Sequence, residues 1–106
     1  MTTFYKIVDV INGEMKTLYH GNNGSKTLQP KKWLKSQQRI AKKYGYITGW
    51  NIISTHEECV EYLKLFKKLE NKEIVRCQAK GVWKKPTNNN KVTVLLAKEI
   101  YIEEFI

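Results

Sequence analysis

The side chains that could carry covalent or metal chemistry are few in this sequence. Only His20, His56, Cys59 and Cys77 offer soft ligands, and their spacing matches no recurring metal-binding pattern. His56 and Cys59 lie three residues apart in a segment with helical periodicity, which would place an imidazole base beside a thiol nucleophile. The favoured alternative is that Cys59 is a small apolar residue on the buried face of that helix, because free cysteine is usually buried. Cys77, in the middle of an expected strand, is assigned to the core for the same reason.

A second kind of chemistry, attraction of an anion, is indicated by the lysine-rich middle of the chain. The sequence has 19 Lys and Arg against 10 Asp and Glu, a formal net charge of +9. Between residues 15 and 56 there are eight basic residues and no acid, whereas the last eight residues hold three Glu and no base. Nucleic acid is the commonest partner of such a one-signed stretch, and phosphate-bearing small molecules come next. The alternative is a surface that serves only solubility.

The predicted binding residues combine cations with aromatic rings. Lysines would attract phosphates in a salt-dependent manner, and Trp33, Tyr44 or Tyr46 would stack on exposed bases. The alternative places Trp33 in the core and the tyrosines along a sheet edge. The candidate nucleic-acid or partner-binding residues are Lys26, Lys31, Lys32, Trp33, Lys35, Arg39, Lys42, Lys43 and Tyr44.

One long helix is expected among the elements that must position these side chains. Thr55 is a candidate N-cap with Glu58 three residues later, and apolar residues then recur at spacings of three and four. This pattern predicts a helix over 55–69. The side chains expected on its buried face include Cys59, Leu63 and Phe66.

The remaining segments predict strands. Asn12-Gly13 is a strong hairpin signal, and Gly81 predicts the end of a strand. Residues 36–44 predict two helical turns. Strands are expected over 4–11, 14–20, 46–53, 73–80, 91–97 and 99–106. The predicted class is α+β, a mixed or antiparallel sheet packed on one main helix near residues 55–69, in a single domain covering 1–106.

Composition and cellular location follow from the same sequence. Hydrophobic residues make up 42% of the chain and aromatic residues 11%, which favours a folded globule over a disordered chain. The sequence contains no apolar run long enough for a membrane span, and its first residues lack the pattern of a secretion signal. Two cysteines suit a reducing compartment. We therefore expect a cytoplasmic protein, in a bacterium or an infected cell, with no membrane partner.

Three segments carry a distant resemblance to a known enzyme family. Residues 18–21, which end in His20 and a glycine, resemble the His-Gly element of NAD-dependent ADP-ribosyltransferases such as the poly(ADP-ribose) polymerases. Residues 48–52 and 99–102 resemble that family's Gly-Ile-Tyr-Phe strand and the late strand that opens with the catalytic glutamate. The resemblance implies a split sheet, NAD as a cofactor, and His20 and Glu99 as catalytic residues that face one another across a cleft.

The same resemblance implies which contacts an active member would make. His20 would hold a ribose hydroxyl of NAD, and the backbone of Gly21 would pair with the nicotinamide amide. The tyrosine that stacks on nicotinamide in that family would fall near Asn51 or Ile52, where no aromatic residue stands. A catalytically degenerate member that inhibits a host protein by surface contact is therefore a further alternative.

The chain also resembles, over nearly its whole length, small proteins of tailed phages and prophages. The shared elements include Tyr5-Lys6-Ile7-Val8, His20-Gly21, Lys32-Trp33, Gly49-Trp50, Glu57-Glu58-Cys59 and Val94-Leu95-Leu96-Ala97. This resemblance implies an accessory phage protein that acts on host replication, transcription or defence. The leading hypothesis is a small basic phage or mobile-element protein that binds nucleic acid or a host nucleoprotein without a cofactor. An ADP-ribosyltransferase-like enzyme that uses NAD, or its degenerate form, is the alternative.

Overall fold

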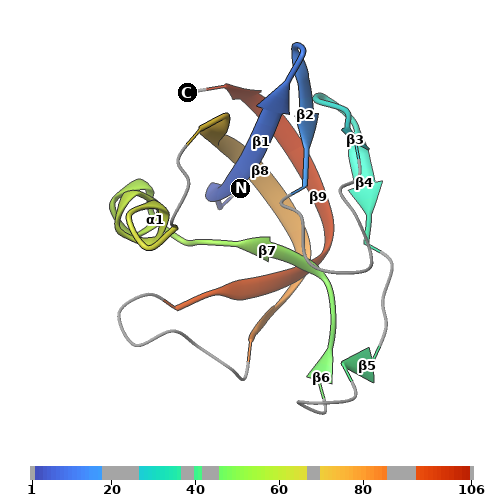
Figure 1. Cartoon of the computed structure of the whole chain (residues 1–106). Coiled ribbons are helices and arrows are strands. Elements are labelled where there is room, and N and C mark those ends of the chain that lie inside the picture. The colour runs from blue at the N-terminus through green and yellow to red at the C-terminus, as the bar shows by residue number, and fades with distance from the viewer. Residues whose placement is uncertain are drawn as a thin grey trace.

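The described part of the chain folds into an antiparallel sheet that curls until it is nearly closed, with one short helix at its side (Figure 1). The computed structural model describes residues 2–17, 27–36, 40–41, 46–66, 70–85 and 93–105. In chain order its elements are β1 Phe4–Ile11, β2 Glu14–Lys16, β3 Thr27–Leu28, β4 Trp33–Lys35, β5 Ile40–Ala41, β6 Tyr46–Ile47, β7 Trp50–Ile52, α1 His56–Leu63, β8 Lys72–Lys84 and β9 Leu95–Phe105.

The sheet is organised around β9. The strand order is β3-β2-β1-β8-β9-β4, β5 and β6 pair separately, and every described pairing is antiparallel. β9 pairs with β8 along one edge, and with both β4 and β7 along the other. β7 reaches β1 in turn, because the backbones of Tyr5 and Ile53 exchange two hydrogen bonds of 2.8 Å. Strands β1, β8, β9 and β7 therefore form a ring, and the sheet is barrel-like.

The hairpin that connects β1 to β2 is the one predicted from the sequence. Asn12 and Gly13 have φ angles of 52° and 80°, the left-handed conformation that both central residues of a type I′ turn require. β2 ends at Lys16, earlier than the predicted limit of residue 20, and residues 18–20 lie outside the described residues.

Two clusters of buried side chains form the core. The larger cluster lies on the inner face of the sheet and consists of Val8, Met15, Leu28, Ile52, Val75, Cys77, Ala97, Ile100 and Ile102. The smaller cluster consists of Ile7, Ile53, Cys59 and Ile74, with Leu63 and Phe66 partly buried against it. Both cysteines are fully buried and unpaired by disulfides, so their assignment to the core is confirmed.

The helix starts where the sequence predicts and ends earlier. The Thr55 side chain caps α1 by accepting a hydrogen bond of 3.1 Å from the Glu58 backbone. α1 ends at Leu63, however, so the predicted extension to residue 69 is wrong for the described residues. Beyond that point Leu65 and Phe66 donate to carbonyls three residues back, which tightens the chain into a turn instead of another helical turn. Leu65 is also 49% exposed, so continuing the helix would gain little apolar burial there.

Several predicted strand limits also need correction. The segment 46–53 is divided between β6 and β7. The helical turns predicted over 36–44 are wrong for Ile40 and Ala41, which form β5, and residues 37–39 and 42–44 lie outside the described residues. Among the described residues, the two strands expected over 91–97 and 99–106 are joined in one continuous strand, β9, which begins only at Leu95. Pairing with three other strands stabilises this length of extended chain, and such non-local pairing has no local sequence signal.

Gly81 lies inside β8 and does not end it. Its φ angle is +63°, and a Cβ placed there would come within 2.9 Å of the Cβ of Lys98 on β9. Only glycine fits both the left-handed backbone and this close approach, so the residue lets β8 stay paired with β9 on both sides of this position. Both strands curve strongly over their length in Figure 1, which is what brings β7 around to β1.

Candidate nucleic-acid interface

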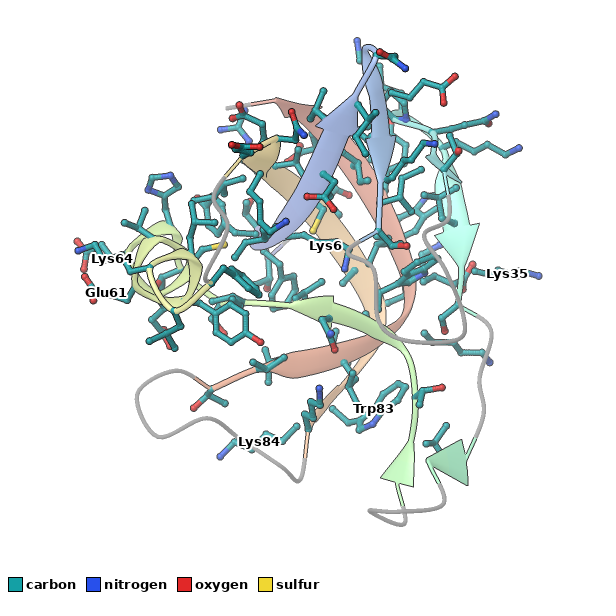
Figure 2. All side chains as sticks on the ribbon, viewed as in Figure 1. Lys6, Lys35, Glu61, Lys64, Trp83 and Lys84 are labelled. Carbon is teal, nitrogen blue, oxygen red and sulfur yellow. The ribbon has the colours of Figure 1, made fainter. Side chains whose placement is uncertain are left out.

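The described part of the lysine-rich segment lies on β4 and on the turn before it. Lys31 and Lys32 are exposed in that turn, and the Lys31 backbone donates to the Ile102 carbonyl at 2.8 Å, which fixes the turn to β9. Lys35, also exposed, ends β4 and points away from the sheet in Figure 2. The predicted binding residues Lys26, Arg39, Lys42, Lys43 and Tyr44 lie outside the residues whose side chains are described.

The pairing of β4, β9 and β8 places six side chains on one face of the sheet. Trp33 lies opposite Tyr101, and Tyr101 opposite Gln78; one step along, Lys35 lies opposite Glu99 and Glu99 opposite Lys80. Residues opposite one another in an antiparallel pair, and residues two apart on a strand, share a face. We call this set the outer face, and its members are Trp33, Lys35, Gln78, Lys80, Glu99 and Tyr101. It faces away from the core, because the alternate residues Ile100 and Ile102 are fully buried.

Two aromatic rings and an ammonium group meet on the outer face. The ring centroids of Trp33 and Tyr101 are 5.6 Å apart with a tilt of 51°. The Lys80 Nζ lies 4.0 Å from the centroid of Trp33, which is a close cation–π contact. Trp33 and Tyr101 are each partly exposed, so Trp33 belongs neither to the buried core nor to a fully exposed surface.

The fold interleaves charges that the sequence keeps apart. Glu99 from the acidic end of the chain lies between Lys35 and Lys80 in the pairing register. Further along β9, Glu103 accepts from Arg76 at 3.5 Å and from Gln78 at 3.4 Å. Among the described lysines of this region, Lys31 and Lys32 on the turn before β4 are exposed and lie outside this alternation, whereas Lys35 is adjacent to the Glu99 carboxylate.

The predicted catalytic pair is only partly described. Glu99 lies in the interior of β9, so its expected position at the start of a strand is wrong. His20 and Gly21 lie outside the described residues, and the expectation that His20 and Glu99 face one another stays a prediction.

The alternative catalytic pair, the Cys59 thiol with the His56 imidazole, does not form a nucleophilic site. Burial raises the pKa of the Cys59 thiol to about 12, so it stays protonated near neutral pH. His56 is exposed, and the centroids of its ring and of the Tyr5 ring are 5.5 Å apart in a T-shaped arrangement. Within the described part of the chain, no group of three or more His, Cys, Asp and Glu side chains is arranged to hold a metal ion.

Lys6 is the unusual residue that sequence analysis missed. It is 7% exposed, on the inner face of β1, and desolvation by burial lowers its pKa to about 8. Its Nζ donates to the Asn51 carbonyl at 2.8 Å and lies 5.8 Å from the centroid of Trp50. The available signal was strand alternation, since Lys6 shares its side of β1 with Phe4 and with Val8, a core residue.

The position of Asn51 explains what the Lys6 side chain does between β1 and β7. Residues two apart on a strand direct their backbone groups to the same edge, so the Asn51 carbonyl points toward β1 as the Ile53 carbonyl does. The Ile53 carbonyl accepts from the Tyr5 backbone, whereas the Asn51 carbonyl accepts from the Lys6 side chain. The ammonium group therefore replaces a backbone donor where β1 and β7 separate.

Comparison with known proteins found no relative of this chain: no family model, no curated protein and no solved structure matches it. Among the described residues, no helix has the length and apolar character needed to cross a membrane.

Proposed function

We propose that this chain is a small basic accessory protein of a phage or mobile element, which acts in the cytoplasm by binding nucleic acid or a host nucleoprotein. The observation that supports the proposal is the exposed lysine group Lys31, Lys32 and Lys35 beside the partly exposed rings of Trp33 and Tyr101. Lysines supply attraction to phosphates, and aromatic rings beside them supply contacts to bases. A surface that serves only solubility needs no such rings.

The first test is the salt dependence of binding. We expect fluorescence anisotropy with a labelled oligonucleotide to show affinity that falls steeply as salt rises from about 50 to about 200 mM. Replacing Lys32 and Lys35 with Gln removes two candidate phosphate contacts. The slope of log affinity against log salt should then fall in magnitude by about 1.4 to 1.8.

A matched control uses two exposed lysines far from the outer face. Lys64 lies on α1, where it pairs with Glu61 at 3.0 Å, and Lys84 lies at the end of β8; Figure 2 shows both well away from Lys35. Replacing Lys64 and Lys84 with Gln changes the net charge equally and should leave the slope nearly unchanged. Equal losses in the two double variants would mean that net charge alone drives binding, and absence of binding at low salt would overturn the proposal.

The second candidate is an ADP-ribosyltransferase-like protein, active or degenerate, with a split sheet packed on its main helix. It is supported by the partly exposed Glu99 on the outer face, where a carboxylate could reach a ligand. Glu99→Gln separates the two candidates. Nicotinamide release from NAD should disappear in the variant if the protein is such an enzyme, whereas nucleic-acid binding should strengthen because a negative charge leaves the lysine-lined face.

A further inference from the structure

We infer that the ligand of the outer face is single-stranded nucleic acid, with an unpaired base stacked on Trp33 in the place that the Lys80 ammonium group now occupies. This inference rests on the proposed function and names its substrate class. It adds Lys80 and Tyr101, which the sequence did not indicate, to the predicted binding residues.

The position of the rings distinguishes single strands from duplexes. In a duplex the bases are stacked and paired inside, and phosphates cover the outside. Trp33 and Tyr101 lie on the sheet itself, on neighbouring strands β4 and β9, and not on a helix or projecting loop that would enter a groove. Rings held on a sheet can stack only on bases that are already unpaired.

The Lys80 ammonium group occupies the position over the Trp33 ring that a stacked base would take. Lys80 lies on β8, two strands and about 10 Å away from Trp33 on β4, so the Lys80 side chain and the indole ring must both lean over β9 to meet. An exposed cation–π contact raises the equilibrium constant for its formation by about two- to fivefold. Stacking of a base on an aromatic side chain raises the corresponding constant by about 5- to 150-fold. A base therefore displaces the ammonium group, which then pairs with a phosphate of the same strand.

The charges of the outer face determine where the phosphates and the bases of a single-stranded nucleic acid would lie. Glu99 lies between Lys35 and Lys80 and repels a phosphate from the centre of the face. Phosphates are then favoured at Lys35, Lys80 and the turn lysines, and the bases lie toward the middle. There the carboxylate of Glu99 can accept from base edges, and the amide of Gln78 can both donate to them and accept from them.

The experiment compares binding of a labelled single-stranded 12-mer with binding of the duplex of the same sequence, at about 50 mM salt. We expect the single strand to bind at least tenfold more tightly. Trp33→Leu should weaken single-strand binding by about tenfold or more, and Trp33→Phe should retain most of it because a ring remains. Circular dichroism and thermal melts establish that each variant is folded.

Two lysines on the same strand give a matched pair that does not depend on the fold of the Trp33 variants. Lys80→Gln should weaken single-strand binding several-fold and reduce the salt slope by about 0.7, whereas Lys84→Gln should change neither. Quenching of tryptophan fluorescence by the oligonucleotide should be strong in the wild type and largely lost in Trp33→Phe.

Each outcome separates the inference from the function it rests on. If the duplex binds as tightly as the single strand, or if Lys80→Gln and Trp33→Leu bind like the wild type, the inference is wrong while nucleic-acid binding stands. If neither form binds at low salt, the proposed function fails as well.

Discussion

Two lysine–tryptophan pairs occupy opposite sides of the same curled sheet. On the inner side the Lys6 Nζ lies 5.8 Å from the centroid of Trp50, and on the outer side the Lys80 Nζ lies 4.0 Å from that of Trp33. Lys6 is 7% exposed and donates to a backbone carbonyl, whereas Lys80 is exposed. The same two residue types therefore serve different purposes. The inner pair links β1 to β7 at the cost of desolvating an ammonium group, and the outer pair can exchange its partner for a ligand.

The largest contrast is expected for the two tryptophans. Trp50 packs against the larger core cluster, and its indole nitrogen donates to the Leu34 carbonyl at 3.0 Å, which connects β7 to β4. Trp50→Ala should lower the free energy of unfolding by about 3–5 kcal/mol through lost burial and an unpaired carbonyl. Trp33→Ala, on the outer face, should lower it by only about 1–2 kcal/mol. Urea unfolding measures both, and equal losses would show that the outer pair is part of the core.

The next contrast is the pH dependence that the inner lysine adds. The folded protein releases the Lys6 proton near pH 8, whereas the unfolded chain holds it up to the ordinary pKa of 10.5. Between those values the unfolded state binds more protons, so this residue makes stability rise with pH. The difference between the two pKa values corresponds to about 3 kcal/mol.

The test compares the wild type with Lys6→Met at pH 7 and near pH 10.5. The free energy of unfolding of the variant, minus that of the wild type, should be about 3 kcal/mol lower near pH 10.5 than at pH 7. Cys59 and Cys77 act in the opposite direction above about pH 9, because burial raises the pKa of each thiol to about 12. Both proteins contain them, and because each thiol also interacts electrostatically with Lys6, the difference reports Lys6 together with this coupling. A difference that stays constant with pH would show that this amine is solvated in the folded state.

The smallest effect is expected for the outer lysine. Lys80→Met removes an exposed cation–π contact and should change the free energy of unfolding by less than about 1 kcal/mol. The change should shrink further at high salt, which screens exposed charges. Thermal melts at two salt concentrations provide the measurement. A loss as large as that of the Trp50 variant would contradict the view that Lys80 is free to leave its ring.

Local signals in the sequence predicted local structure well. The Asn12-Gly13 turn, the Thr55 cap and the burial of Cys59 each depend on residues close together in the chain, and each is confirmed. The length of the helix was overestimated, because its apolar spacing continues past Leu63 while the chain turns away. Periodicity states which side chains would share a face, not whether a neighbour is present to cover them.

The arrangement of the candidate site depended on pairings between distant segments. Trp33 and Lys35 were indicated by residue type, but Lys80 joins them only because β4 and β8 flank the same strand. Glu99 was predicted at a strand start, and continuous pairing placed it in the interior of β9. Lys6 was missed because a lysine within an apolar strand is normally assigned to solvent. Register between segments far apart in sequence decides the positions of Lys80 and Glu99, whereas the inward side of Lys6 follows from strand alternation within β1.

The central place of β9 has a consequence for how the protein folds. Residues 95–105 provide the neighbour for β4 and β7, and one of the two neighbours of β8. Until this segment is in place, these strands have unpaired edges and the ring from β1 to β7 cannot close. Assembly therefore requires contacts between distant parts of the chain at once, which is typical of proteins that fold in milliseconds to seconds. Detachment of β9 alone would expose three strand edges together, so a brief local opening at this one strand would be enough to start aggregation.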